Sequence, residues 1–355
     1  MDIDSILRLA VQRGASDLHL CVPGSPMARI RGSLVSLDED IDLTPDDTRA
    51  ALEAVANKGD QEEFWETKEL DCGYSLRGVA RFRVNVYMQR GTVAIAFRIL
   101  PFRIPTMEDL DLPLVCKQLV MKPKGLVLVT GPTGSGKSST LAAMIDYLNG
   151  QAAKRVITVE DPIEYLYPSR KCAIVQRELG RDTHSFAEAL RHALRQDPDV
   201  ILIGEMRDLE TISIALTAAE TGHLVLGTLH TTGGVESIDR IVDVFPASQQ
   251  NQIRLQVSLV LEGVISQYLM PRAEGVGRVA AFEVILASSA IRNLIRSGKS
   301  HEIPSYMQMG KDRGMQTFDW SLADLVKRGA ITQEEALSKT QKPQELTALL
   351  MRDQK

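Results

Sequence analysis

The sequence predicts an α/β protein in which a small α+β domain precedes a mostly parallel sheet. After about residue 115, apolar strand-like runs alternate with helical patterns, which is typical of parallel strands joined by crossover helices. Before residue 100, helical patterns are followed by two strand-like runs that read as a hairpin. The 355 residues are enough for two domains, each with its own core.

The first third of the chain begins with a predicted helix, because residues 3–10 place apolar side chains at helical spacing. Alternation over residues 17–20 indicates a strand. A threonine followed by proline and two aspartates opens a second helix, expected over 44–57 and broken by Gly59.

The runs 79–88 and 92–100 predict a hairpin, since a glycine-containing turn joins them. The period of two in the first strand turns its apolar side chains to the core and its basic side chains to the other face. This basic face consists of Arg81, Arg83, Asn85 and Arg98. It is either an ordinary solvated surface or a set of arginines that reach phosphates, for example on a neighbouring subunit.

Residues 101–114 contain three prolines and are the predicted linker between an N-terminal domain, 1–100, and a second domain, 115–355. The strands expected in the second domain are 126–130, 156–159, 200–203 and 224–229. A capping box at Ser185 predicts a helix that runs to Gln196. From about residue 250 to the end we expect mainly helices.

One loop of the second domain has the spacing G-x-x-x-x-G-K-[ST], between a buried strand and a helix that Gly150 is expected to end. Such a loop wraps backbone N–H groups around phosphate oxygens, and its lysine reaches the β- and γ-phosphates. The expected nucleotide-binding residues are Gly131, Pro132, Thr133, Gly134, Ser135, Gly136, Lys137, Ser138 and Ser139. The sequence therefore predicts ATP as the bound nucleotide, with Lys137 stabilising charge on the transferring phosphoryl group.

Polar side chains follow the predicted strands at the sheet edge where α/β proteins bind ligands. Glu160 and Glu164 come after one strand and Glu205 after the next, while His223 begins a third strand and His230 ends it. A carboxylate here can orient or deprotonate the attacking water, and Glu205 is the first choice for this base. The histidines are candidate sensors of the γ-phosphate, although a lone histidine at a strand end is more often structural.

Magnesium is the expected metal, held by the hydroxyl of Ser138 together with ATP phosphates. The acidic residue that often holds Mg²⁺ on the neighbouring strand is missing, because Gly204 stands in its place. Asp199 lies at the other end of that strand and is expected to be a turn residue. Glu160 or Glu164 is expected to support the ion through water.

The composition argues against several classes of protein. The net charge of −5 gives no positive field for nucleic acid, so a nucleic-acid translocase is a weak alternative. The four cysteines form no C-x-x-C pair, which argues against a zinc ribbon and favours reduced thiols in the cytosol. The acidic N-terminus does not resemble a signal peptide, and no apolar run approaches the ~18 residues of a transmembrane helix.

In their order along the chain, these motifs resemble those of the secretion-ATPase superfamily, and within it the type IV pilus retraction ATPases. The matching segments are 14–20, an N-terminal signature; 131–138, the Walker A loop; 159–164, the Asp box; 203–208, an atypical Walker B motif; and 221–232, the His box. Residues 290–296 look like the retraction motif, with an apolar stripe and a polar face of Arg292, Asn293 and Arg296 for another domain or partner. The chain has neither the tetracysteine insertion nor the extra N-terminal domains usual in pilus-extension and type II secretion ATPases.

The resemblance implies a homohexamer whose subunits join a PAS-like N-terminal domain to a RecA-like ATPase domain with C-terminal helices. It also implies that Arg81, Arg83 and Arg98 meet the nucleotide at a cleft between domains or subunits. The expected activity is ATP hydrolysis that drives pilus retraction and twitching motility, in the cytoplasm at the inner-membrane pilus machine. The expected partners are a pilus platform protein and a paralogous pilus ATPase, with no nucleic acid.

Four alternatives remain open at this point. They are an accessory retraction ATPase or ATP-binding regulator with little turnover, a type II secretion ATPase, a small-molecule kinase, and the nucleic-acid translocase mentioned above. A kinase would need an acceptor pocket and a lid with arginines, and neither is obvious after Ser138.

Overall fold

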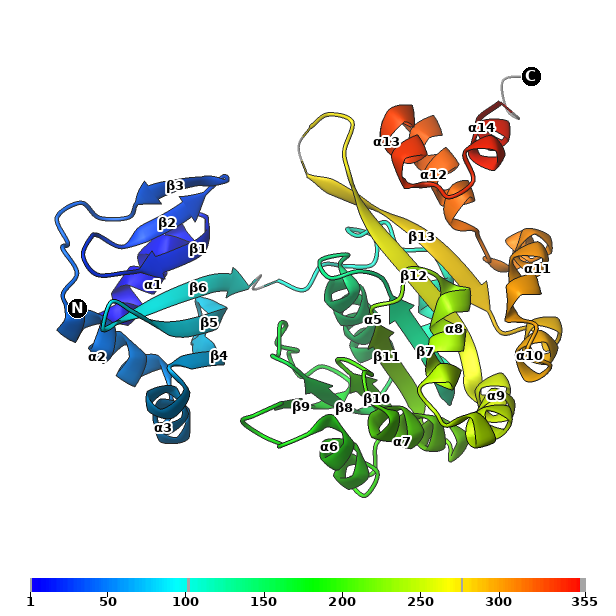
Figure 1. Ribbon diagram of the computed structural model, residues 1–355, viewed down its shortest axis with the longest axis horizontal. Coiled ribbons are helices and arrows are strands. Elements are labelled where there is room, and N and C mark those ends of the chain that lie inside the picture. Colours follow the sequence, from blue (N-terminus) through cyan, green and yellow to red (C-terminus); the bar gives the residue numbers. More distant parts are fainter. Residues whose placement is uncertain (1, 101–102, 276, 352–355) are drawn as a thin grey trace. The chain divides into compact units, whose positions relative to one another are not determined.

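The structure is a computed structural model that describes residues 2–100, 103–275 and 277–351. Its contacts divide the chain into two compact units (Figure 1). The first unit is Met1–Ile104 together with Pro162–Leu166, and the second is Pro105–Asp161 together with Tyr167–Lys355. Of the predicted linker 101–114, residues 101 and 102 lie outside the described residues.

The first unit is a six-stranded antiparallel sheet in the order β3-β2-β1-β6-β5-β4, with helices packed against it. In chain order it contains α1 (Ile3–Gln12), β1 (Ala15–Leu20), β2 (Met27–Ile30), β3 (Ser33–Ser36), α2 (Pro45–Val55), α3 (Lys58–Thr67), β4 (Glu69–Leu76), β5 (Ala80–Gln89) and β6 (Thr92–Leu100). Its core is centred on Phe64, Phe82 and Phe97, which are fully buried. The alternation predicted for β5 is confirmed, because Phe82, Val84 and Val86 are buried and the residues between them are not.

The two helix starts in this unit show how local capping sets the boundaries. Thr44 caps α2 through a capping box with Asp47, as the sequence indicates. The expected break at Gly59 is wrong, because α2 ends at Val55 and Gly59 lies in the first turn of a separate helix, α3. Asn57 and Asp60 form the capping box that opens α3, and this local signal outweighs the poor helix propensity of glycine.

The predicted hairpin is also confirmed. β5 and β6 pair antiparallel from Arg81 opposite Leu100 to Gln89 opposite Thr92. Arg90 and Gly91 both have positive φ, 50° and 80°, which is the two-residue turn that matches strand twist.

The second unit is a seven-stranded sheet in the order β13-β12-β7-β11-β10-β8-β9, parallel except for β13. It contains α4 (Val115–Val120), β7 (Gly125–Thr130), α5 (Lys137–Gln151), β8 (Arg155–Glu160), β9 (Ala173–Glu178), α6 (Phe186–Ala193), β10 (Val200–Ile203), α7 (Leu209–Glu220), β11 (Leu224–Leu229), α8 (Gly234–Asp243), α9 (Ala247–Val260), β12 (Leu261–Pro271), β13 (Arg278–Leu286), α10 (Ser289–Arg296), α11 (Ile303–Met309), α12 (Phe318–Lys327), α13 (Gln333–Lys339) and α14 (Pro343–Met351). Helices α4 and α5 pack on one face of the sheet, and α7, α8 and α9 on the other. Both faces are therefore covered, which explains why β7, β10 and β11 are buried along their whole length.

The predicted α/β class is confirmed, and the four predicted strands are β7, β8, β10 and β11. Two local expectations in this unit are wrong and one is incomplete. After residue 250 the chain forms mostly helices, as expected, but β12 and β13 add two long strands that the sequence did not indicate. Gly150 does not end α5 but lies inside it, since the helix continues to Gln151 and buries its apolar side chains against the sheet. The helix capped by Ser185 ends at Ala193, short of Gln196.

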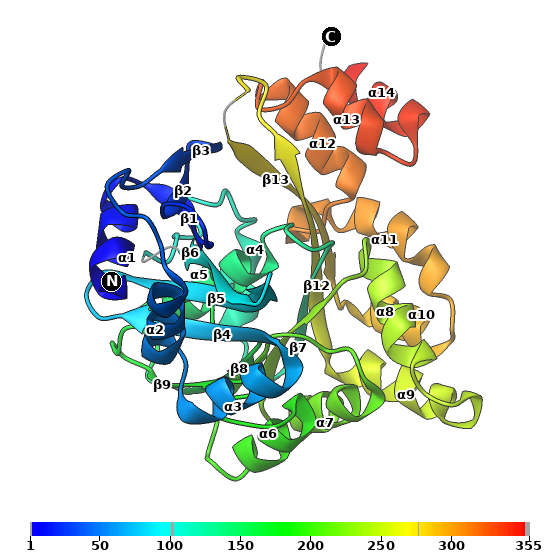
Figure 2. The ribbon, with the colours of Figure 1, turned by 60° about the vertical axis from the view of Figure 1, so that its left-hand side comes forward.

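The end of the chain is helical, as expected, and packs on the β12–β13 hairpin. Figure 2 shows this hairpin reaching past β7 towards α12 and α13. The predicted stripe of α10 is confirmed, with Ile291, Leu294 and Ile295 buried. Among the described residues, no helix combines the length and apolar character needed to span a membrane.

Candidate active site

The loop between β7 and α5 has the backbone geometry of a phosphate-binding loop. Gly131, Gly134 and Gly136 have φ of +144°, +77° and +91°, values that residues with a side chain rarely adopt. A Cβ on Gly131 would lie 2.3 Å from the carbonyl oxygen of Gln267 and 2.6 Å from the hydroxyl of Ser135. The loop therefore follows a path that only glycine permits. It continues directly into the N-terminus of α5, where free backbone N–H groups favour an anion.

The lysine of this loop is held in place by the loop itself. Lys137 is buried, and its Nζ donates to the carbonyl oxygens of Gly131 at 2.8 Å and Pro132 at 3.0 Å. The Ser135 hydroxyl is buried with no hydrogen-bond partner among the described residues. A cationic ammonium and an unsatisfied buried hydroxyl beside a glycine cradle fit a phosphate group.

The side chains of Glu205 and His230 meet at the carboxyl ends of β10 and β11. His230 Nε2 lies 2.8 Å from Glu205 Oε1. The same carboxylate oxygen accepts a bond from Nε of Arg207, and this bond raises the pKa of the arginine above its ordinary value. On its other side, His230 Nδ1 lies 3.4 Å from the hydroxyl of Thr133 in the glycine loop.

These contacts form one polar chain, Thr133–His230–Glu205–Arg207, which we call the Glu205 chain. All four side chains line a single open cleft of about 760 Å³. The adjacency follows from the topology, because β11 lies between β7 and β10, so the ends of the three strands meet at one edge. The Glu205 chain thus connects the phosphate-binding loop to the predicted base.

Glu160 ends β8 at the same edge of the sheet. Its Oε1 accepts hydrogen bonds from the hydroxyl of Thr158 at 2.6 Å and from the amide of Gln176 at 3.3 Å. Ser138 is exposed in the first turn of α5, so its hydroxyl is available to a cation carried by phosphates. Within the described parts of the chain, no group of three or more acidic, histidine or cysteine side chains forms a metal cluster. The available donors thus fit an ion that arrives with the nucleotide.

Asp199 and His223 lie at the opposite edge of this sheet. Asp199 accepts from the backbone N–H of Arg155 and from Lys154, and these bonds outweigh its burial and lower its pKa. His223 immediately precedes β11, and its Nδ1 lies 3.0 Å from the carbonyl oxygen of Ala218 near the end of α7. Six residues of β11 separate His223 from His230, roughly 20 Å along a strand. The structure does not bring His223 to the Glu205 chain of this subunit.

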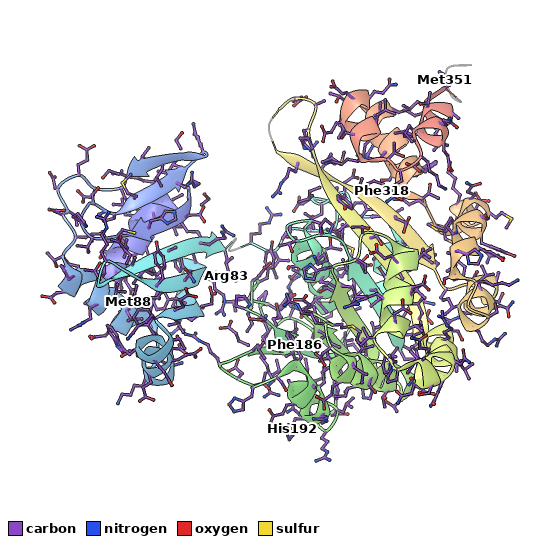
Figure 3. The ribbon with its side chains drawn as sticks, in the orientation of Figure 1. Arg83, Met88, Phe186, His192, Phe318 and Met351 are labelled. Carbon is purple, nitrogen blue, oxygen red and sulfur yellow. The ribbon has the colours of Figure 1, made fainter. Side chains whose placement is uncertain are left out.

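The predicted basic face lies on β5 and β6 of the first unit, where Figure 3 labels Arg83. Arg83 and Arg98 are directly opposed across the two strands, and each is paired with an aspartate. The pairs are Arg83 with Asp71 at 3.8 Å and Arg98 with Asp17 at 3.1 Å. Both guanidinium groups are exposed, although Asp17 is not, and ion pairs that water reaches contribute little to stability, so the two arginines can exchange partners.

Arg81 makes shorter contacts than Arg83 and Arg98. Its Nε donates to the carbonyl oxygen of Ile163 at 2.7 Å, and its Nη1 donates to the hydroxyl of Ser75 at 2.9 Å. Ile163 and Glu164 belong to the short segment Pro162–Leu166, which groups with the first unit. The predicted Asp box is thus divided, with Glu160 in the second unit and Glu164 in the first.

Sequence reasoning missed Gln267 and Glu283, which support the site from β12 and β13. Gln267 is 1% exposed and binds the glycine loop, and Glu283 accepts the N–H of Gly234 at the start of α8. The signal that could have found them is a polar residue inside an apolar run, which in a buried strand marks a side chain with a specific partner. Both residues lie in the region predicted to be helical, so this signal was not used.

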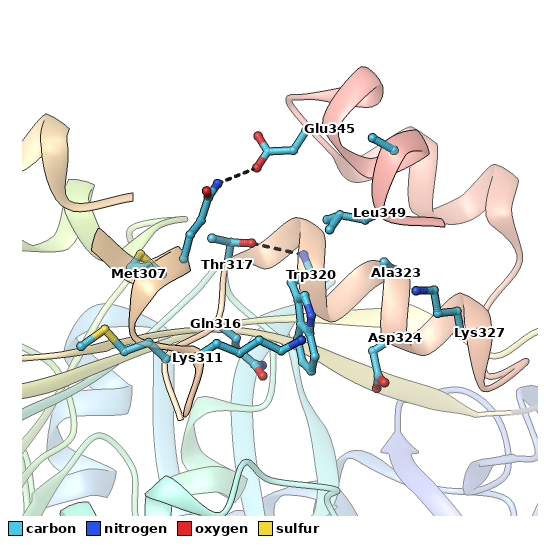
Figure 4. A pocket seen from close by; sticks show the side chains of 13 residues that line it. Met307, Lys311, Gln316, Thr317, Trp320, Ala323, Asp324, Lys327, Glu345 and Leu349 are labelled. Carbon is cyan, nitrogen blue, oxygen red and sulfur yellow. Dashed lines mark hydrogen bonds between the residues drawn. The ribbon is translucent and has the colours of Figure 1, made fainter. Parts of the chain in front are cut away.

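Another cavity, of about 390 Å³, lies among the C-terminal helices (Figure 4). Trp320 lines it next to Lys311, whose Nζ lies 4.6 Å from the ring centre, and Glu345 accepts a bond from Gln308. None of the predicted site residues lines this cavity.

Comparison with known proteins agrees with these features. A family model described as "Type II/IV secretion system protein" matches residues 105–338. The chain is 49% identical to the Pseudomonas aeruginosa "Type IV pilus retractation ATPase PilT" over 97% of this chain and 99% of the relative. It is 40% identical to the "Type IV pilus ATPase PilU" of the same organism, over 99% of this chain and 91% of the relative.

Among solved structures, the pilus retraction motor PilT with bound ADP matches with a TM-score of 0.92 at 48% identity. The match covers 98% of this chain and 99% of that one. The chain therefore belongs to the family of type II/IV secretion system proteins that includes the pilus retraction ATPase PilT.

Proposed function

We propose that this protein is a motor that hydrolyses ATP to drive retraction of a type IV pilus. The observation that carries the proposal is the Glu205 chain, which links the phosphate-binding loop to a carboxylate suited to activate water. The family supports the same activity, since the relative PilT is named a pilus retraction ATPase and matches nearly the whole chain.

In this proposal the nucleotide phosphates lie on the glycine loop. Lys137 exchanges its contacts with Gly131 and Pro132 for phosphate oxygens, since the ammonium gains more from a charged acceptor than from carbonyl groups. Mg²⁺ bound with ATP, held by Ser138 with Glu160 or Glu164 acting through water, would supply charge neutralisation at the phosphates.

Hydrolysis requires an oriented water molecule and a proton acceptor. The carboxylate of Glu205 accepts the proton as the water oxygen bonds to the γ-phosphorus and the bond to the β-phosphate oxygen breaks. His230 touches both Glu205 and Thr133, so it relates the state of the loop to the position of the base. His223 has no place in this step within one subunit.

The mechanical step rests on the two units. We propose that they are the N-terminal domain, 1–100, and the ATPase domain, 115–355, joined by the linker 101–114, in a homohexamer. The weakly paired arginines Arg83 and Arg98, together with Arg81, then stabilise the nucleotide when the cleft closes, and closure and reopening produce movement. The motor acts in the cytoplasm on a platform protein of the inner-membrane pilus machine.

A second candidate is an accessory retraction ATPase with little turnover of its own, which the match to PilU favours. The two candidates differ in turnover by the purified protein alone. Free phosphate released at a rate that Lys137→Ala abolishes supports the motor. ATP binding without phosphate release supports the accessory subunit.

The decisive variant is Glu205→Ala in the full-length protein. We expect it to bind ATP as the wild type does and to lose at least about 100-fold in turnover, because a positioned base contributes on the order of 10²–10⁴. Glu210→Ala is the matched control, since Glu210 is exposed on α7 and pairs with Arg191. Near-normal hydrolysis by Glu205→Ala would remove Glu205 from the role of base, and twitching scored with the same variants tests the link to the pilus.

A further inference from the structure

Gln267 bridges two parts of the phosphate-binding loop from beneath. Its Nε2 donates to the carbonyl oxygen of Ser135 at 2.6 Å, and its Oε1 accepts from the hydroxyl of Thr140 at 2.8 Å. It is 1% exposed on β12, one residue past the pair formed by Ser266 and Thr130. A single buried amide thus fixes a loop residue against the first turn of α5.

The close fit around this amide explains two glycines of the loop. A Cβ on Gly136 would lie 3.0 Å from Nε2 of Gln267, and a Cβ on Gly131 would lie 2.3 Å from its backbone oxygen. Both distances are shorter than a normal contact, so β12 approaches the loop as closely as a backbone without side chains allows. The loop therefore rests directly on Gln267.

The bond to Ser135 has a consequence for the next N–H group. A trans peptide is planar, so the carbonyl of Ser135 and the N–H of Gly136 point in opposite directions. Gln267 holds this carbonyl on the side of β12, which turns the N–H of Gly136 away from the sheet strand and towards the open side of the loop. On the proposed function, that is the side where the phosphates bind.

We propose that Gln267 is a positioning residue that keeps the N–H of Gly136 directed at a nucleotide phosphate. Without its amide, the peptide between Ser135 and Gly136 is free to rotate and to present a carbonyl oxygen to the phosphate, which repels it. The carbonyl oxygen of Ser135 can only accept, so it holds the nitrogen end of the amide, and Thr140 contributes by donating its hydroxyl to the oxygen end. This inference rests on the proposed nucleotide binding at the same loop.

A purely structural role makes a different prediction. If Gln267 only satisfied buried polar atoms, its loss would lower the stability of the fold and weaken the binding of all nucleotides to the same degree. If Gln267 positions the loop, its loss weakens the binding of nucleotides that place a phosphate in the loop, and AMP binding is unchanged because AMP has no β-phosphate to reach it.

The test compares full-length wild type, Gln267→Met and Thr140→Val by calorimetric binding of ADP and AMP, with unfolding midpoints for each. We expect Gln267→Met to bind ADP about tenfold more weakly, the scale of one hydrogen bond, with AMP affinity unchanged. Thr140→Val keeps the side-chain shape and is expected to weaken ADP by about threefold. Ser266→Ala is the control, because it removes only the bond to Thr130, and its ADP affinity should match the wild type.

Three outcomes overturn the inference. They are unchanged ADP affinity in a folded Gln267→Met, equal weakening of ADP and AMP, and, if Gln267→Met does not fold, unchanged ADP affinity in Thr140→Val. Failure of the wild type to bind ADP is a separate result, because it refutes the proposed function before any variant is compared.

Discussion

Arg292 on α10 bonds four groups from two segments of the chain, residues 258–262 and Ala287, and the effect of its removal can be estimated. Its Nη1 donates to the carbonyl oxygens of Ser258 and Leu259 at 2.9 and 2.8 Å, and its Nε donates to that of Ala287 at 3.1 Å. Its Nη2 lies 2.7 Å from Glu262. We expected Arg292 on a polar face that contacts a partner. Its contacts instead lie within this chain, where they satisfy carbonyl groups at the end of α9 and pair with the start of β12.

The magnitude follows from these contacts. Each bond to a main-chain carbonyl contributes about 0.5–1.5 kcal/mol, and a partly exposed ion pair adds at most about 1 kcal/mol. The side chain of Arg292 is 27% exposed, so water replaces part of what is lost. We therefore expect Arg292→Ala to lower the free energy of unfolding by about 2–3 kcal/mol.

Urea unfolding of the full chain measures this loss, and hydrogen exchange locates it at the last turn of α9. Arg296→Ala is the control, because Arg296 is exposed and bonds only Asn293 of its own helix among the described contacts, so a change within about 0.5 kcal/mol is expected. Equal stability of the two variants, with unchanged exchange in α9, would refute this stabilising role of Arg292 and favour the expected contact with a partner.

Three further variants test Glu283 on β13, the glycine loop and helix α5. Burial raises the pKa of Glu283 above its ordinary 4.5, so the folded state binds more protons than the unfolded state between these two pKa values, and this contribution to stability falls as pH rises through that window. Glu283→Gln should therefore gain stability relative to wild type as the pH rises from the ordinary pKa of 4.5 until the raised pKa is passed, and a difference that is flat with pH contradicts this. Gly131→Ala should weaken ADP binding more than tenfold, because its Cβ would lie 2.3 Å from the oxygen of Gln267. Gly150→Ala, inside α5 with its nearest neighbour at 3.7 Å, should bind ADP normally and gain about 0.5–1 kcal/mol in unfolding experiments.

Most of the local structure was predictable because its causes lie within a few residues. The caps at Thr44 and Ser185 and the stripe of α10 each depend on side chains within one or two helical turns. Gly59 and Gly150 misled the prediction, because a neighbouring capping box and packing on the sheet outweigh the cost of one glycine. β12 and β13 were missed because a buried apolar run does not distinguish a strand from a helix.

Motif spacing and alternation are local properties of the chain, so the sequence was enough to predict the phosphate-binding loop, the ends of its strands and the candidates Glu205 and His230. Which of these candidates meet depends on the order of the strands in the sheet. The order of β7, β11 and β10 places His230 against Glu205 and leaves His223 at the far edge. The pairing of β12 with β7 brings Gln267 to Ser135 across 132 residues. Contacts at such separation depend on which strands become neighbours, and the burial of whole sheet faces, which no local pattern encodes, selects that order.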